Sequence, residues 1–125
     1  MIVRARKTKQ KDAIRAAFLI ADRPLSPEET LKHAKESVAG ISIATVYRNI
    51  GTLLEEHWLT CVSVPGETDR YEVAGKEHHH HFRCTTCGKV FEMPGCSVQY
   101  RQDLPVGFHV TGHEFFLFGV CADCN

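Results

Sequence analysis

Four cysteines occur as two Cys-x-x-Cys pairs, Cys84–Cys87 and Cys121–Cys124. Two such pairs supply four thiolates, the donor set typical of a tetrahedral structural zinc site. Two disulfides are the first alternative, but the chain shows no secretory signal pattern, and cytoplasmic proteins keep their cysteines reduced. An iron–sulfur cluster is a second alternative, without separate support in the sequence. The pattern therefore predicts structural Zn²⁺ in a cytoplasmic protein.

Four consecutive histidines, His78–His81, stand just before the first cysteine pair. Side chains alternate between the two faces of a strand, so His79 and His81 would face one side. His78 and His80 would face the other. One tract can thus serve two metal ions. Imidazole ligands suit Zn²⁺ and Fe²⁺, and added carboxylate ligands shift the preference of a site towards harder ions. Candidate partners are Glu72 and Glu92 for His79 and His81, and His113 and Gln99 for His78 and His80.

A polar edge strand and an expression tag are the alternatives for the histidine tract. Its internal position, separated from Cys84 by only two residues, disfavours a tag. Two further cysteines, Cys61 and Cys96, belong to neither Cys-x-x-Cys pair. Cys61 is typical of a buried small residue on a strand and Cys96 of a helix start, with a redox or ligand role as the alternative.

The residues before position 58 predict three short helices. Apolar spacing predicts the first over about 8–21. Ser26-Pro27-Glu28-Glu29 predicts the start of the second, which would run to about residue 37, because it combines an N-cap Ser, a first-turn Pro and a capping-box Glu. Ser42 would cap the third helix. The predicted buried stripe of that helix is Ile43, Val46, Ile50, Leu53 and Leu54.

A β-hairpin is predicted next, with strands at 58–64 and 70–73 around a turn at 65–69. Three helices followed by a hairpin form a winged helix, whose third helix enters the major groove of duplex DNA. Thr45, Tyr47 and Arg48, on or beside the exposed face of that helix, suit contacts with thymine methyl groups, phosphates and guanine. A plain helical bundle with a solvated arginine is the alternative.

The net charge is zero, but basic side chains gather near the N-terminus. A local basic arm matters more to a polyanion than the total charge does. Lys7 and Lys9 are the candidates for DNA contacts, and a solvated tail is the alternative. The arm comprises Arg4, Arg6, Lys7, Lys9, Lys11 and Arg15, against Asp12.

Residues 74–77 predict a hinge between a DNA-binding domain at 1–73 and a metal-binding domain at 78–125. The second domain would hold strands at 81–83, 89–93, 108–111 and 115–120 and a helix from about 96 to 104. Phe115–Phe118 form either an apolar surface shared by two subunits or an ordinary buried strand.

Domains as small as these two often need a metal or a second subunit to stay folded. No apolar run is long enough to span a membrane.

Further motifs extend along the chain: Ala44-Thr45-Val46-Tyr47-Arg48, Arg70-Tyr71-Glu72, Cys84-x-x-Cys87-Gly88-Lys89-Val90-Phe91-Glu92 and Gly119-Val120-Cys121-x-x-Cys124. With the histidine tract, they resemble the ferric uptake regulator family, which includes iron-, zinc-, manganese- and peroxide-responsive members. The resemblance implies an α+β fold, with an N-terminal winged helix and a C-terminal α/β dimerisation domain that holds structural zinc. It also implies a homodimeric transcriptional repressor, not an enzyme, that binds operator DNA when a regulatory divalent metal is bound.

The resemblance also assigns roles to individual residues. Tyr47 and Arg48 would face DNA, and the four paired cysteines would hold zinc. The regulatory metal, Fe²⁺, Zn²⁺ or Mn²⁺, would be bound by Glu72, His79, His81 and Glu92. An additional metal site would comprise His78, His80, Gln99 and His113.

The sequence departs from the family pattern at several positions. Where the family often supplies a regulatory histidine, just before the second helix, this chain reads Arg23-Pro24-Leu25. His33, further along that helix, is the candidate substitute. Gln99 and His80 stand where the additional site often has acidic residues. Two rival functions remain open: a zinc metallo-enzyme using the histidines, and a zinc-binding module without DNA regulation.

Overall fold

The computed structural model describes residues 2–96 and 104–125. The chain divides into two compact units, Met1–Lys76 and Glu77–Asn125. Among the described residues, no helix has the length and apolar character needed to cross a membrane.

Three helices open the first unit: α1 (Ile2–Ala21), α2 (Pro27–Ala34) and α3 (Ile43–Glu55). The predicted capping box of α2 is present, since Ser26 Oγ accepts from the Glu29 N–H at 3.1 Å and Glu29 Oε1 accepts from the Ser26 N–H at 3.0 Å. Ser42 caps α3 as predicted, accepting from the Thr45 N–H at 3.2 Å. The first helix begins at Ile2 rather than near residue 8, because the basic arm contains no residue that breaks a helix.

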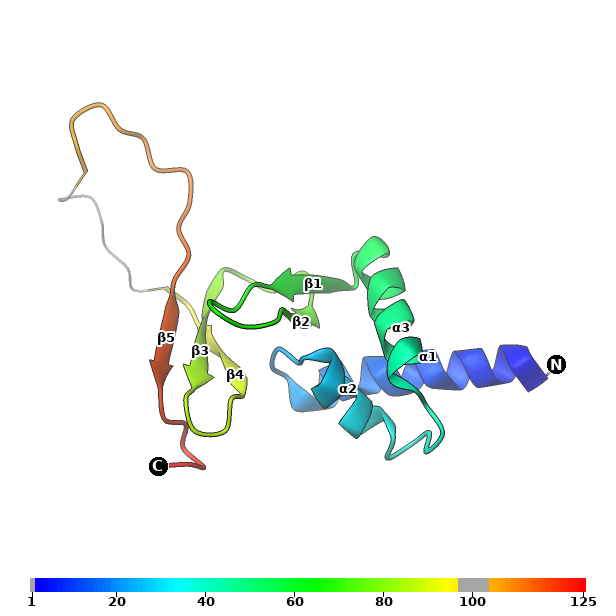
Figure 1. Cartoon of the computed structure of the whole chain (residues 1–125). Helices are drawn as coiled ribbons and strands as arrows, with labels where there is room; N and C mark the ends of the chain where they lie inside the picture. Colours follow the sequence, from blue (N-terminus) through cyan, green and yellow to red (C-terminus); the bar gives the residue numbers. More distant parts are fainter. Residues whose placement is uncertain (1, 97–103) are drawn as a thin grey trace. The chain divides into compact units, whose positions relative to one another are not determined.

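A two-stranded wing follows the helices. Strands β1 (Leu59–Val62) and β2 (Arg70–Val73) are antiparallel, with Leu59 opposite Val73 and Val62 opposite Arg70. Leu25 and Tyr71 exchange two backbone hydrogen bonds of 2.9 Å, which tie β2 to the segment that leads into α2. Helices α1–α3 followed by this hairpin give the order of elements predicted for a winged helix (Figure 1).

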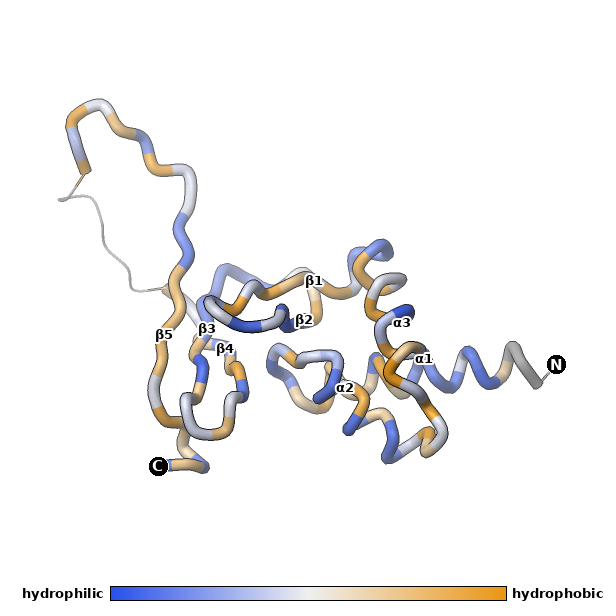
Figure 2. Tube along the Cα trace, in the orientation of Figure 1, coloured by the Kyte–Doolittle hydropathy of each residue, from blue (hydrophilic) through white to orange (hydrophobic). Residues whose placement is uncertain are grey.

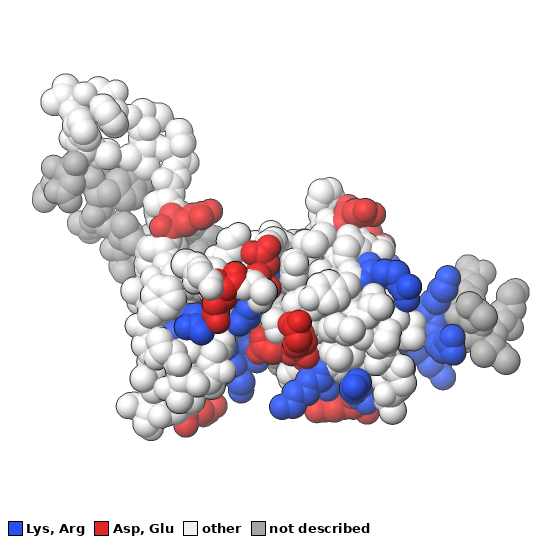
Figure 3. Space-filling view, in the orientation of Figure 1, with Lys and Arg blue, Asp and Glu red and all other residues white. Residues whose placement is uncertain are grey.

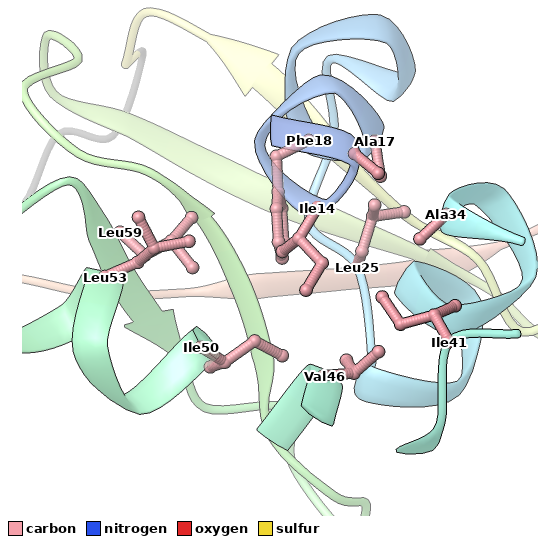
Figure 4. Close-up of a cluster of buried hydrophobic side chains, with 11 residues drawn as sticks. Ile14, Ala17, Phe18, Leu25, Ala34, Ile41, Val46, Ile50, Leu53 and Leu59 are labelled. Atoms are coloured by element: carbon pink, nitrogen blue, oxygen red, sulfur yellow. The ribbon is translucent and has the colours of Figure 1, made fainter. Parts of the chain in front are cut away.

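One apolar core joins the helices to the wing (Figure 4). Ile14 and Phe18 of α1 lie against Leu25, and α3 contributes Leu53, which lies beside Leu59 of β1 in Figure 4. Burying side chains of this size contributes about 1.5–3 kcal/mol each. The core also contains Ala13, Ala17, Ala34, Ile41, Val46 and Ile50. The predicted stripe of α3 is wrong at Ile43, which is 38% exposed because it occupies the first position of the helix.

The second unit is a three-stranded sheet in the order β4-β3-β5. Strand β3 (His79–Cys84) pairs antiparallel with β4 (Val90–Pro94) and parallel with β5 (Phe116–Gly119). A Cβ atom at Gly119 would lie 3.0 Å from the Phe82 ring. This position therefore lets β5 approach β3 closely.

Part of the sequence prediction for this unit is wrong. Residues 108–111 form no strand, and Phe108 is 69% exposed. An alternating pattern makes a strand only where a neighbouring strand completes its hydrogen bonds, and residues 108–111 pair with none of the described strands. The helix predicted over 96–104 falls mainly on 97–103, outside the described residues.

Candidate metal centres and nucleic-acid interface

The four paired cysteines meet at one point of the second unit. The sulfur atoms of Cys84, Cys87, Cys121 and Cys124 all lie within 4.8 Å of one another. The Cys87 and Cys121 sulfurs are 3.9 Å apart. The backbone N–H groups of Cys87 and Cys121 each donate to Cys84 Sγ at 3.4 Å. Four converging sulfurs with backbone donors fit a structural zinc ion, as predicted from the spacing.

Backbone geometry brings the two knuckles together. Gly88 turns the first knuckle with φ +77°, a left-handed conformation that glycine adopts without strain. Thr85 donates twice to the Gly119 carbonyl, from its N–H at 2.7 Å and from Oγ1 at 3.0 Å. These bonds fix the end of β5 beside the first knuckle, two residues before Cys121.

The electrostatics of the four thiols favour a bound cation. The N–H groups of Cys87 and Cys121 lower the pKa of the Cys84 thiol to about 5. Hydrogen bonding to the Cys121 sulfur, followed by burial, raises the pKa of Cys124 to about 12. The Cys84 thiolate thus forms readily, whereas the Cys124 thiolate must form beside existing negative charge. A divalent cation offsets that repulsion.

The histidine tract divides between two faces of β3, as its alternation predicts. The His78 and His80 rings both contact the His113 ring, with Nε2–Nε2 distances of 3.1 and 3.2 Å. The His79 and His81 rings contact each other, with ring centroids 4.8 Å apart. Two separate imidazole groups therefore come from one tract.

Cys96, for which the sequence offered a ligand role only as the alternative, completes the first group. Cys96 Sγ lies 3.0 Å from His113 Nε2, and His78, His80, Cys96 and His113 form one cluster of possible ligands. Gln99, the predicted fourth member, lies outside the described residues. Cys61 belongs to no such cluster among the described residues, and it is exposed rather than buried as predicted.

His80 is the most enclosed histidine of the tract, at 3% exposed, and its ring stacks on Phe115 at 4.0 Å. Burial, followed by the neighbouring His78 and His113 rings, lowers the pKa of His80. The lowered pKa favours the neutral form of the imidazole. A neutral ring is the form that binds a metal ion.

The second imidazole group faces a carboxylate on the neighbouring strand. His81 is the cross-strand partner of Glu92 in the β3–β4 ladder, and directly opposed residues project from the same face of a sheet. His79 Nδ1 lies 2.7 Å from the Glu77 carbonyl oxygen, a contact that fixes the orientation of the ring. Glu72 lies on β2 of the first unit, opposite Thr60, and its membership of the regulatory site stays a prediction.

The N-terminal half of α3 presents two of the predicted DNA-contacting side chains. Tyr47 is 52% exposed, and Arg48 is also exposed. Thr45 differs from the prediction, since it is only 7% exposed. Its hydroxyl accepts hydrogen bonds from Ser42 Oγ at 3.1 Å and Arg48 Nη2 at 3.1 Å. Thr45 therefore positions Arg48 and leaves little of its own surface for DNA.

Basic side chains gather at the N-terminal end of α1, at the right of Figure 3. Lys7 and Lys9 are both exposed on this helix. Further along, Lys11 Nζ and Arg15 Nη2 lie 2.7 and 3.8 Å from the carboxylate of Glu56 beyond α3. Lys11 and Arg15 are thus paired with a carboxylate, whereas Lys7 and Lys9 are exposed.

The family model of the ferric uptake regulator family matches residues 3–118 of this chain. The chain belongs to the ferric uptake regulator family. It is therefore a member of a family of metal-dependent transcription regulators with an α+β fold. The α+β fold and the described groups of possible metal ligands agree with this membership.

Individual members of the ferric uptake regulator family resemble the chain over most of its length. A ferric uptake regulation protein of Campylobacter jejuni is 35% identical over 123 residues, which span 94% of this chain and 78% of the relative. The solved ferric uptake regulator of Helicobacter pylori, described as having three functional metal binding sites, is 29% identical with a TM-score of 0.70, covering 93% and 79% of the two chains. The peroxide stress regulator of Campylobacter jejuni, 22% identical with a TM-score of 0.61 over 96% and 92%, shares the fold.

Proposed function

We propose that this chain is a homodimeric repressor that binds double-stranded operator DNA when a regulatory divalent metal is bound. The observation that carries the proposal is the division of one histidine tract into two donor groups on a unit distinct from the winged helix. With the four-cysteine cluster, these groups make three candidate metal sites. The Helicobacter pylori relative is described as having three.

The DNA-binding surface would centre on α3. Tyr47 and Arg48 are exposed on its N-terminal half, the part of a recognition helix that reads base edges. Lys7 and Lys9 would contact phosphates from α1. Each phosphate contact releases counterions, so binding should weaken steeply with salt.

The regulatory metal would bind His79, His81 and Glu92 of the second unit, with Glu72 as the fourth ligand. Two imidazoles and two carboxylates suit Fe²⁺, Zn²⁺ or Mn²⁺. Glu72 comes from the wing, so a metal held by all four residues would favour one arrangement of the two units. A ligand that binds one arrangement better shifts the population towards it. A coupling free energy of about 1–3 kcal/mol would change DNA affinity roughly 5–150-fold.

Dimerisation would use β5. This strand lies at one edge of the described sheet, and its residues are mainly apolar, as their colour in Figure 2 shows. Leu117 is 46% exposed, Phe118 52%, and the adjoining Val120 48%. Exposed apolar side chains on an edge strand are typical of a surface that a second copy covers.

The decisive experiment measures operator affinity against Fe²⁺, Zn²⁺ and Mn²⁺ on protein that retains its structural zinc. Operator fragments would first be selected from random duplex DNA. Affinity should rise with one or more of these metals, and His79→Ala and His81→Ala should abolish the rise. His109→Ala is the matched control, since His109 is exposed and belongs to none of the donor clusters. Equal affinity of the metal-free and metal-loaded proteins would rule out the proposal.

A further inference from the structure

More polar groups approach Nε2 of His113 than this single nitrogen can form hydrogen bonds with. Three groups converge on its Nε2 atom: His78 Nε2 at 3.1 Å, His80 Nε2 at 3.2 Å and Cys96 Sγ at 3.0 Å. An imidazole nitrogen carries either one proton or one lone pair. It can therefore satisfy one of these neighbours, not three. Of the four residues, His80 is buried, His113 is half-buried, and His78 and Cys96 are exposed. The buried His80 nitrogen therefore relies on a partner within this cluster.

A metal ion at the centre of the four atoms resolves the problem, because every donor then points a lone pair at the same cation. Nitrogen and sulfur ligands about 2.0–2.3 Å from tetrahedral Zn²⁺ are separated from one another by roughly 3.3–3.8 Å. The observed separations to His113 are slightly shorter, and all four donor atoms lie within 4.8 Å of one another. A small outward shift of the side chains would accommodate the ion.

The position of Cys96 follows from the β3–β4 register. His79 is opposite Pro94, so residue 78 is opposite residue 95, and Cys96 comes one residue later. In a continuing strand, Cys96 would project from the face opposite to His78. Gly95 instead has φ +76°, which ends the strand and turns the next side chain back towards His78 and His113.

We propose that Cys96 is the fourth ligand of this site, which would be a three-histidine, one-thiolate centre for Zn²⁺. This inference deepens the proposed function, which places an additional metal at the three histidines. A thiolate differs from the amide of Gln99 or a carboxylate in two ways. It neutralises one charge of the cation, and as a softer donor it favours Zn²⁺ over Mn²⁺ or Fe²⁺.

The test uses Co²⁺ as the spectroscopic probe on full-length protein that retains its structural zinc. A cysteine ligand gives Co²⁺ a thiolate-to-metal charge-transfer band in the near ultraviolet. The wild type should show this band, and Cys96→Ser should lose it. Cys61→Ser, the matched control at an exposed cysteine outside the clusters, should retain it. Co²⁺ that exchanged into the four-cysteine site would give the same band in all three proteins, so the difference spectrum isolates Cys96.

Competition with a zinc-binding dye gives a second readout. Cys96→Ser should weaken Zn²⁺ binding at this site by at least about tenfold, because one of four ligands is lost. Gln99→Ala should leave it unchanged. The proposal is overturned if Cys96→Ser retains the band, or if Gln99→Ala weakens binding and Cys96→Ser does not. Both measurements are made without DNA, so a failure of the repressor proposal would leave their outcome unaffected.

Discussion

Arg23 and Glu29 form an ion pair of 2.7 Å at the start of α2. Arg23 stands where the family resemblance places a regulatory histidine. Its guanidinium cannot bind a cation, and it also donates to the Pro24 carbonyl at 3.1 Å. Arg70 of β2 approaches the same carboxylate, with Nε 3.5 Å from Glu29 Oε1. Position 23 therefore belongs to a polar network that joins α2 to the wing. His33, the candidate substitute for the family's histidine, lies on α2.

Replacing Glu29 should destabilise the winged helix in two separable steps. Glu29→Gln keeps a residue able to complete the capping box but loses the ion pairs, and should cost about 0.5–1 kcal/mol. Glu29→Ala loses the capping box as well and should cost about 1–2 kcal/mol. Urea unfolding followed by the fluorescence of Trp58, the single tryptophan, measures both. Glu36→Gln, at an exposed carboxylate beyond α2, should cost nothing measurable. Equal midpoints for the wild type and Glu29→Ala would contradict this account.

The difference between wild type and Glu29→Gln should depend on pH. Burial alone would raise the pKa of Glu29, but the Ser26 N–H and the Arg23 guanidinium outweigh it, so the pKa lies below its ordinary value of 4.5. A carboxylate whose pKa is lowered in the folded state contributes its full stabilisation of the fold above its unfolded-state pKa. That contribution is lost as the pH falls through the folded-state pKa. The difference in unfolding free energy should be constant from pH 7 to about 5 and should shrink by about pH 3. If the difference in unfolding free energy instead grew as the pH fell, the assigned direction of the Glu29 pKa shift would be wrong.

Loss of one paired cysteine should remove structural zinc and unfold the second unit alone. Cys121→Ser leaves three thiolates for a site whose closed form needs four. After dialysis against a mild chelator, the wild type should keep about one zinc per chain and the variant close to none. Far-UV circular dichroism should retain most of its helical signal, because α1–α3 all belong to the first unit. Cys61→Ser should keep its zinc. Full zinc retention by Cys121→Ser would show that the cluster is not the structural site.

Sequence reasoning succeeded where a feature depends on local spacing. The capping box of Ser26 and Glu29 follows from residues three apart, and the division of the histidine tract follows from the two-residue period of a strand. The two cysteine pairs, although far apart in the chain, were also placed correctly, because two Cys-x-x-Cys pairs are the donor pattern typical of one structural zinc site.

It failed where a position depends on partners distant in the chain. Cys96 joins the histidines through the β3–β4 register and the left-handed Gly95, neither of which the residue types specify. Thr45 was placed on or beside the exposed face by helical periodicity, yet its hydroxyl bonds with Ser42 and Arg48 and lies buried. Both errors concern side-chain environment rather than the elements themselves.

Arg48→Ala should weaken operator binding whether or not regulatory metal is present. A side chain that contacts a base or a phosphate contributes to affinity in either metal state, and its loss should cost about 1–3 kcal/mol. Thr45→Val removes the hydroxyl that accepts from Arg48 and should cost less, since the guanidinium remains. Affinity measured across a range of salt concentrations tests this. Lys89→Ala, at an exposed lysine of the second unit, should leave affinity unchanged. An unchanged affinity for Arg48→Ala would remove α3 from the proposed interface.

Phe118→Lys should convert the proposed dimer into monomers. Phe118 is half exposed on β5, and its ring lies 6.2 Å from that of Phe116, which in turn stacks on His81 at 5.5 Å. A charge in the centre of an apolar interface loses its hydration without a partner, so it should weaken association by several kcal/mol. Sedimentation velocity would show the change in mass, and operator affinity should fall because one half-site contact is lost. Val106→Lys is the control at a fully exposed valine outside β5. A Phe118→Lys protein that still sediments as a dimer would move the interface away from this edge of the sheet.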